Sequence, residues 1–299
     1  MLLMGRAVPG WDTLGTVTSL ISAERLVAAL PDLTVLDVRW RLGRSDGAEQ
    51  YAAGHIAGAA YVDLETDLAD PPGPEGRHPL PDAERFAAAM RRCGVHADRP
   101  VVVYDDWSGL AATRGWWLLR YHGHREVRVL DGGWKAWLTA GGPAEAGARL
   151  PRPGDFAADP GHLPVVDADG AARVAEVGVL LDARAPERFR GDVEPVDPVA
   201  GHIPGAVNVP ATVNLHDGRF RDRAELAAAY GCTRDAAEVA VYCGSGVTAT
   251  HDVLALHELG REAALYPGSW SGWLTDPTRP VAVGSDDEQR VTDRRHTGS

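Results

Sequence analysis

The feature that most constrains this chain is an internal repeat. Four short blocks of the first half return in the second half in the same order, at spacings just under half of the 299 residues. The blocks are apolar runs ending in Asp-x-Arg (35–39 and 180–184), Gly-His-Ile segments (54–59 and 201–206), apolar runs ending in Tyr (101–104 and 239–242) and Trp-x-x-Trp segments (132–137 and 268–273). Because this spacing is too long for a solenoid, we predict two tandem copies of one domain.

The repeat also suggests where the domains begin and end. We assign residues 19–141 to an N-terminal domain and residues 166–281 to a C-terminal domain. Residues 142–165 are rich in Pro, Gly and Ala, which predicts a linker. Residues 282–299 are polar and lack apolar periodicity, which predicts a disordered tail.

Within the first copy, short apolar runs alternate with amphipathic runs. Residues 34–38, 99–104 and 126–130 are rich in β-branched residues and too short for helices, whereas residues 22–30 and 82–92 have a helical pattern. Strands that alternate with helices predict an α/β fold in which each tandem domain is a mainly parallel sheet flanked by helices. Ligands of such sheets bind beyond the carboxyl ends of the strands.

Composition excludes several classes of protein. The chain has 42 acidic residues against 30 Lys and Arg, a net charge of −12, which argues against nucleic acid or a membrane surface as partner. No apolar stretch is long enough to span a bilayer, and the first residues are not typical of a secretory signal. The three cysteines, Cys93, Cys232 and Cys243, are too few and too scattered for a disulfide framework. We therefore expect a cytoplasmic protein.

The loop after Tyr242 is the strongest candidate for chemistry. Cys243 opens the segment Cys-Gly-Ser-Gly-Val-Thr, which leads into the helical run 250–259. The glycines allow tight curvature with inward-facing N–H groups, and the helix N-terminus adds partial positive charge. Both should stabilise a thiolate at a fixed position. Cys93 and Cys232 lack such a loop, and we expect them to be buried structural cysteines.

The first copy serves as an internal control for this loop. When the copies are aligned at Tyr104 and Tyr242, Asp105 corresponds to Cys243. A carboxylate stands where the nucleophile would be. We therefore expect a catalytically degenerate N-terminal domain that helps to shape the site of the C-terminal one.

The tandem domains, the repeated blocks and the Cys243 loop together resemble the two-domain rhodanese-family sulfurtransferases, over roughly residues 19–280. The loop is most similar to that of the 3-mercaptopyruvate branch. This resemblance implies that Cys243 takes a sulfane sulfur from a small anionic donor and becomes a persulfide. A thiol, such as thioredoxin or a small thiol, or cyanide would then remove the sulfur. The resemblance implies no metal and no organic cofactor.

The resemblance also assigns roles to individual residues. It implies that Ser245, His78 and Glu65 assist Cys243 in catalysis: the acid holds the histidine, which polarises the hydroxyl that protonates the departing enolate. The donor-binding residues that it implies are Arg188 and the loop residues Gly244, Gly246, Val247, Thr248 and Ala249. A planar guanidinium at Arg188 suits the carboxylate of a donor.

Two features of the sequence disagree about the donor. Neutral Gly244 and Ser245 stand where thiosulfate-type enzymes carry Arg and Lys, which favours 3-mercaptopyruvate. Asp197, however, stands where the 3-mercaptopyruvate branch usually carries a second arginine, as in thiosulfate-type enzymes. Arg190 is a candidate to replace that arginine. We favour 3-mercaptopyruvate as donor and keep thiosulfate as the alternative.

Two other functions use similar residues. Cysteine phosphatases and arsenate reductases also place a thiolate in an anion-binding loop, but they need an arginine at the sixth position after the cysteine, which is Ala249 here. A non-catalytic sulfur-carrier or regulatory module is a more remote alternative, because the nucleophile loop is intact.

Overall fold

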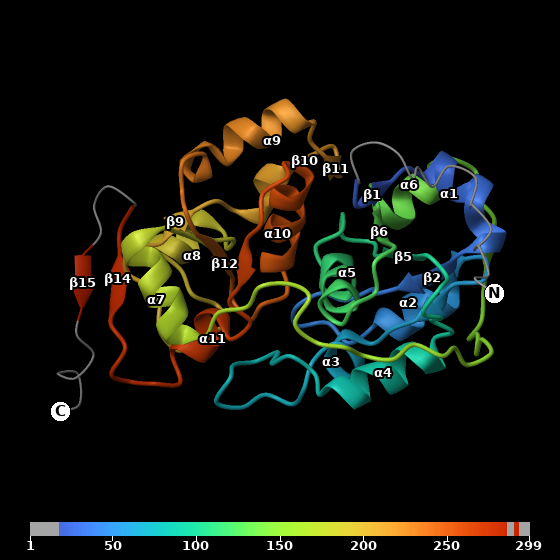
Figure 1. The fold of residues 1–299 in the computed structure, drawn as a ribbon, viewed down its shortest axis with the longest axis horizontal. Helices are drawn as coiled ribbons and strands as arrows, with labels where there is room; N and C mark the ends of the chain where they lie inside the picture. The colour runs from blue at the N-terminus through green and yellow to red at the C-terminus, as the bar shows by residue number, and fades with distance from the viewer. Residues whose placement is uncertain (1–17, 286–289, 293–299) are drawn as a thin grey trace, which may run out of the picture. The chain divides into compact units, whose positions relative to one another are not determined.

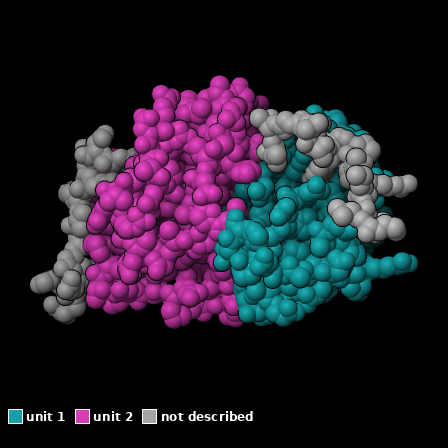
Figure 2. All heavy atoms as spheres, viewed as in Figure 1, with its two compact units in different colours: residues 1–68, 81–162 teal, residues 69–80, 163–299 magenta. Residues whose placement is uncertain are grey.

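The computed structural model describes residues 18–285 and 290–292, which form two compact units (Figures 1 and 2). Unit 1 contains the described residues up to 68 together with residues 81–162. Unit 2 contains residues 69–80 and the described residues from 163 onward. Among the described residues, no helix is both long enough and apolar enough to cross a membrane.

Unit 1 is built on a five-stranded sheet in the order β1-β6-β5-β2-β4, and every neighbouring pair is parallel. The strands of unit 1, inside and outside this sheet, are β1 (Leu20–Ile21), β2 (Thr34–Asp37), β3 (His55–Ile56), β4 (Ala60–Tyr61), β5 (Val101–Tyr104), β6 (Val127–Leu130) and β7 (Ala144–Glu145). Its helices are α1 (Ala23–Ala29), α2 (Gly47–Ala53), α3 (Leu64–Asp67), α4 (Ala83–Arg92), α5 (Ala112–Tyr121) and α6 (Gly133–Thr139). A short 3-10 helix covers Leu30–Asp32.

Unit 2 repeats this plan with a parallel sheet in the order β13-β12-β8-β9. Its strands are β8 (Val179–Asp182), β9 (Val207–Asn208), β10 (Leu215–His216), β11 (Arg219–Phe220), β12 (Val239–Tyr242), β13 (Ala264–Leu265), β14 (Val281–Val283) and β15 (Arg290–Thr292). Its helices are α7 (Ala168–Val177), α8 (Pro186–Arg190), α9 (Arg223–Ala229), α10 (Ala249–Glu258) and α11 (Ser269–Trp273). Short 3-10 helices cover Ala211–Asn214 and Gly231–Thr233.

Alternation along the strands divides the core of each unit into two faces. In unit 2, α7 and α11 bury Val174 and Trp270 against Leu180, Ala240 and Tyr242 on one face of the sheet, and α10 covers the other (Figure 1). In unit 1, α1 and α6 pack together on one face, and α5 contacts strands β5 and β6. The predicted α/β fold with two parallel sheets is confirmed.

The regular elements also begin and end close to the predicted positions. The predicted helices 22–30 and 82–92 appear as α1 and α4, and their caps are Ser22 and Asp82, whose side chains accept hydrogen bonds from backbone N–H groups of the first turn. The predicted strands 34–38, 99–104 and 126–130 appear as β2, β5 and β6.

The repeated sequence blocks form the same buried network in each unit. In unit 2, Arg184 bonds the carboxylate of Asp182 at 2.6 Å and the Gly201 carbonyl at 2.7 Å, and its guanidinium lies 4.8 Å from the ring of Trp270. The Tyr242 hydroxyl accepts a hydrogen bond at 3.1 Å from the N–H of Ile203, the residue after His202. Unit 1 uses the equivalent residues Asp37, Arg39, Gly54, Ile56, Tyr104 and Trp134.

The two histidines of the repeated blocks, His55 and His202, each contact a backbone carbonyl oxygen of their own unit. His55 Nδ1 lies 3.0 Å from the Tyr51 carbonyl oxygen, and His202 Nδ1 lies 2.7 Å from that of Phe189. Each imidazole also stacks on the aromatic ring of the same partner. Both histidines therefore serve the fold of their own unit.

Most of the predicted linker 142–165 packs against unit 1. Phe156 is buried and meets Phe86 edge-to-face at 6.0 Å, and the Gly154 N–H donates to the Arg91 carbonyl at 2.8 Å. One apolar ring and backbone hydrogen bonds are enough to fix a segment whose composition is typical of a linker. The units divide instead after residue 162.

The predicted disordered tail 282–299 also differs from the structure where it is described. Residues 282 and 283 belong to β14, which pairs antiparallel with β15. His202 also forms a bridge to Ala282 on β14. Residues 286–289 and 293–299 of that expectation lie outside the described residues.

Candidate active site

Cys243 lies where the sequence predicts it, directly after β12 and before α10. Its side chain is buried, and in the described part of the chain one hydrogen bond reaches the sulfur, from the Gly246 N–H at 3.2 Å. Gly246 has φ +78°, and a Cβ there would lie 2.4 Å from the Pro267 carbonyl oxygen. The loop therefore requires glycine at this position in order to turn its amide toward the sulfur.

Ser269, which is not among the residues predicted from the sequence, anchors the cysteine from α11. Its hydroxyl accepts a hydrogen bond from the Cys243 N–H at 3.1 Å and donates one to the Tyr266 carbonyl at 3.0 Å. Its φ of +52° is unusual for a residue with a side chain. The repeat carries a signal for it, because Ser269 replaces Gly133 of the first copy, which has φ +54°.

Ser245 and His78 meet as predicted, although they are 167 residues apart. The Ser245 hydroxyl lies 2.7 Å from His78 Nδ1, and both side chains are buried. The contact forms because residues 69–80, which lie between α3 and α4 in sequence, belong to unit 2. A hydroxyl at this distance from an imidazole nitrogen can exchange a proton with it.

Glu65, the predicted acid partner of His78, lies on α3 in unit 1. Its carboxylate accepts a hydrogen bond from the indole N–H of Trp40 at 2.6 Å. Its role in orienting His78 stays a prediction.

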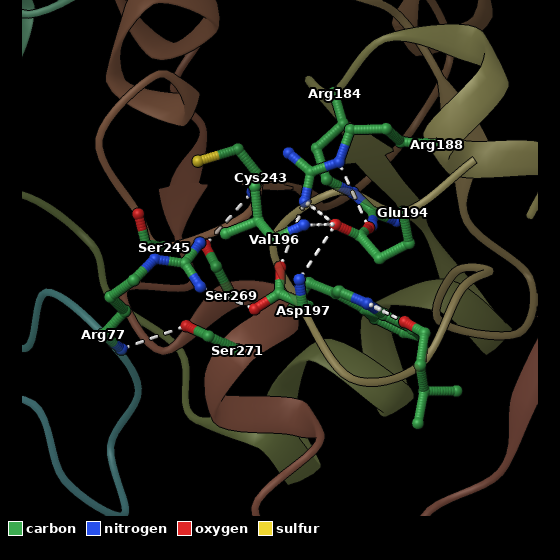
Figure 3. A network of polar contacts seen from close by, with 12 residues as sticks. Arg77, Arg184, Arg188, Glu194, Val196, Asp197, Cys243, Ser245, Ser269 and Ser271 are labelled. Carbon is green, nitrogen blue, oxygen red and sulfur yellow. Dashed lines mark hydrogen bonds and ion pairs between the residues drawn. The ribbon is translucent and has the colours of Figure 1, made fainter. Parts of the chain in front are cut away.

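Arg188 projects from α8 into a network of carboxylates (Figure 3). It donates to both carboxylate oxygens of Glu194, at 3.1 and 2.6 Å, and to Asp197 at 3.0 Å. Burial acts to raise the pKa of Glu194, but the hydrogen bonds from Arg188 and from two backbone N–H groups outweigh it, so the pKa is lowered. Glu194 is therefore an anion that fixes the orientation of Arg188.

Arg190, the candidate to replace the second arginine, does not join this network. Its side chain is 42% exposed and pairs with Asp192 at 2.8 Å. The structure brings a different arginine to the network. Arg77, which directly precedes His78 in the sequence, donates a hydrogen bond to Asp197 at 2.6 Å.

Comparison with known proteins agrees with this architecture. A family model described as a rhodanese-like domain matches residues 22–140 and again residues 168–276. The chain belongs to the rhodanese-like family. The two matched segments cover both copies of the repeat.

Named relatives of this rhodanese-like chain are sulfurtransferases. A Mycobacterium tuberculosis protein named thiosulfate sulfurtransferase is 47% identical over 89% of this chain and 97% of its own length. A Pseudomonas aeruginosa protein named 3-mercaptopyruvate sulfurtransferase is 48% identical over 89% of this chain and 98% of its own. The crystal structure of the 3-mercaptopyruvate enzyme from Escherichia coli matches with a TM-score of 0.77 at 35% identity, covering 85% of this chain and all of that one.

The remaining cysteines of this rhodanese-like chain differ from Cys243 in their surroundings. Cys93 is buried in unit 1, as expected, and burial raises the pKa of its thiol to about 12. The expectation for Cys232 is wrong. This thiol is exposed, because the 3-10 helix Gly231–Thr233 buries Thr233 instead.

The other predicted loop residues lie between Cys243 and the start of α10 in the same rhodanese-like unit. Gly244 and Val247 are buried, and Thr248 and Ala249 lead into α10. No hydrogen bond from the Val247 or Thr248 amide is found within the described ranges. Among the described residues there is also no cluster of His, Cys, Asp or Glu that could hold a metal ion.

Proposed function

We propose that this protein is a sulfurtransferase that moves a sulfane sulfur from 3-mercaptopyruvate, through a persulfide on Cys243, to an acceptor. The observation that carries the proposal is the Cys243 loop. It places a buried sulfur between a strand end and a helix start, with a glycine N–H directed at it. The family and the named relatives support the same reaction.

In the first half-reaction, the Cys243 thiolate attacks the sulfur of the donor. A sulfur–sulfur bond forms, the carbon–sulfur bond of the donor breaks, and its electron pair stays on carbon as an enolate. Ser245, backed by His78 at 2.7 Å, delivers the proton that turns this enolate into pyruvate. The proton that the donor thiol loses replaces the one that Ser245 and His78 deliver, so the numbers of protons lost and gained are equal.

In the second half-reaction, an acceptor attacks the outer sulfur and releases the Cys243 thiolate. The acceptor is a thiol, such as thioredoxin or a small thiol, or cyanide. We further propose a cytoplasmic location, where thiols of this kind are abundant. The three free cysteines, Cys93, Cys232 and Cys243, suit such a reducing compartment.

Thiosulfate is a second candidate donor. The Mycobacterium tuberculosis relative carries that name, and two arginines lie beside the loop at Gly244. The ratio of kcat/KM for 3-mercaptopyruvate and thiosulfate, measured side by side, decides between the two donors.

Mass spectrometry of donor-treated protein tests the nucleophile. We expect the mass of one added sulfur atom on Cys243, and we expect the Cys243→Ser variant to lose transfer by at least about 10³-fold. The Cys232→Ser variant is the matched control, since it removes an exposed thiol and should keep full activity. Absence of added sulfur on Cys243, or transfer retained in Cys243→Ser, would refute the proposal.

A further inference from the structure

Asp197 joins two arginines that come from distant parts of the sequence. Its Oδ1 accepts from Arg77 Nη1 at 2.6 Å, and its Oδ2 accepts from Arg188 Nη2 at 3.0 Å (Figure 3). The Asp197 side chain is 3% exposed, so the bridge is shielded from water. One carboxylate therefore fixes the distance and orientation of both guanidinium groups.

Arg77 is also held at its backbone. Its N–H donates to the Ser271 hydroxyl on α11 at 3.0 Å. Its Nε is buried and has no hydrogen-bond partner among the described residues. The side chain thus keeps donor capacity in a position fixed from two directions.

The guanidinium nitrogens that Asp197 does not use converge on the loop. A Cβ built on Gly244 would lie 3.3 Å from Arg77 Nη2 and 3.6 Å from Arg188 Nη1. Neither of these two nitrogens donates to any group in the part of the chain that the structure describes. Gly244 directly follows the nucleophile and has no side chain. The space beside its Cα is therefore lined by two guanidinium nitrogens, Arg77 Nη2 and Arg188 Nη1, whose N–H groups can bind a ligand.

The charges around this space cancel. Arg77 and Arg188 face Asp197 and Glu194. Arg184, which lies 3.5 Å from Glu194, is itself paired with Asp182. A formally neutral cluster with two directed donors suits a monoanion better than a dianion, because a second negative charge would lie close to two carboxylates.

We propose that Arg77 is a second donor-binding residue, which clamps the donor's carboxylate together with Arg188 beside Gly244. Asp197 is a positioning residue that holds the two arginines and keeps the cluster neutral. It thereby favours a 2-oxo monocarboxylate over a dianion. This inference rests on the proposed function. In it, Arg77 takes the role of the second arginine, whose usual position is occupied by Asp197 in this chain.

The Arg77→Gln variant tests the clamp. We expect KM for 3-mercaptopyruvate to rise by about tenfold or more, as the loss of a charge-assisted hydrogen bond implies. Discharge of a preformed persulfide should stay within about twofold of the parent rate, because the donor has left by then. The matched control is Arg190→Gln, which changes an exposed arginine two residues from Arg188 and should leave KM unchanged.

Two further variants separate binding from folding and from transfer. In a Cys243→Ser background, calorimetry with 3-mercaptopyruvate measures binding without any reaction, and Arg77→Gln should weaken that binding whether or not transfer occurs. Arg77→Lys keeps the charge without the planar fork, so it should restore part of the affinity. An unchanged KM and unchanged binding in Arg77→Gln overturn the inference, as does an equal effect of Arg190→Gln.

Asp197→Asn tests the charge balance. This change gives the cluster a net positive charge, so kcat/KM for thiosulfate should rise relative to that for 3-mercaptopyruvate by about fivefold or more. An unchanged ratio would show that Asp197 does not influence which donor the protein prefers. If wild-type protein forms no persulfide while Arg77→Gln still weakens binding, the proposed function fails and the clamp stands.

Discussion

The Asp105 loop of unit 1 and the Cys243 loop of unit 2 occupy equivalent places, yet their amides are used differently. Both loops join a central strand to a long helix, and in both the carbonyl of the first residue accepts an N–H from a tryptophan. Asp105 is buried and accepts four hydrogen bonds of 2.7 to 2.9 Å, from Trp107, Gly109, Ala111 and Ala112. The sulfur of Cys243 accepts one within the described chain.

This difference shows what a filled anion site looks like in this fold. The carboxylate oxygens of Asp105 lie two bonds beyond Cβ, whereas the thiol sulfur of Cys243 lies one bond beyond it. The outer sulfur of a persulfide also lies two bonds beyond Cβ. We therefore expect the persulfide to reach loop amides that the thiol leaves unused, such as those of Val247 and Thr248.

Removing the carboxylate of Asp105 should have the largest effect on stability. Burial raises the pKa of Asp105, while its four amide hydrogen bonds favour the charged form. Asp105→Ala leaves four N–H groups without their acceptor, so we expect the free energy of unfolding to fall by about 3 kcal/mol or more. Denaturant unfolding of the full chain measures the change.

The neighbouring Asp106→Ala variant is the control for this experiment. Asp106 is 29% exposed and pairs with Arg41, so its loss should cost less than about 1 kcal/mol. If Asp105→Ala is no more destabilising than Asp106→Ala, the Asp105 loop is not a filled anion site and the comparison fails.

The fold was largely predictable because the repeated blocks are the buried parts of the molecule. Inside unit 2, Arg184 lies over the rings of both Tyr242 and Trp270, so the types and order of these residues leave a pattern in the sequence. Packing of the Pro- and Gly-rich residues 142–162 on unit 1 was not predictable, since it depends on single contacts such as that of Phe156. The same holds for residues 69–80 in unit 2.

The candidate site was predictable only where its chemistry is local in sequence. Cys243 and Gly246 lie in one loop whose composition already indicates its shape. Arg77 and Asp197 are 120 residues apart, and no sequence pattern links them. Arg188 and Arg190 are both arginines on α8, but positions two apart on a helix lie on different faces, and Arg188 pairs with the buried Glu194 whereas Arg190 is 42% exposed.

The helices that follow the two loops extend the comparison to pH. The fourth residue of α5 is Gly115, and that of α10 is Asp252, which is buried and bonded by Asn214 at 2.8 Å. Burial raises the pKa of Asp252 to about 8, well above the usual range of a carboxyl, although the hydrogen bonds of Tyr230 and Asn214 oppose the shift. Unit 1 has no titratable group at this position.

The Asp252→Asn variant tests this difference. The raised pKa means that the folded state holds a proton that the unfolded state has lost. Its contribution to stability is therefore complete below about pH 4 and is lost as pH rises through about 8. Between pH 5 and 7, the free energy of unfolding of the parent should fall relative to Asp252→Asn, by up to about 1.4 kcal/mol per pH unit.

Asp217→Asn is the control for the pH experiment, because Asp217 is 93% exposed. It should show the pH dependence of the parent chain. If the unfolding free energies of the parent and of Asp252→Asn change in parallel between pH 5 and 7, Asp252 is ionised in the folded protein and the prediction is wrong.

The smallest effect is expected where the two copies differ by one hydroxymethyl group, at Gly133 and Ser269. Ser269→Gly gives unit 2 the residue that unit 1 carries as Gly133, and it removes the hydrogen bond to the Cys243 N–H. Glycine relieves the positive φ of this position, so stability should change by less than about 1 kcal/mol. The loop should hold Cys243 less firmly, and kcat/KM should fall by about threefold to tenfold.

Ser269→Ala separates the hydroxyl from the backbone. Alanine loses the hydrogen bond and keeps the unfavourable φ of +52°, so it should be less stable than both serine and glycine. The expected order of transfer activity is Ser, then Gly and Ala together, because only serine holds the Cys243 N–H. If Ser269→Gly transfers sulfur as fast as the parent, the hydroxyl serves only the fold, and the anchoring of Cys243 rests on the Trp270 N–H that both copies share.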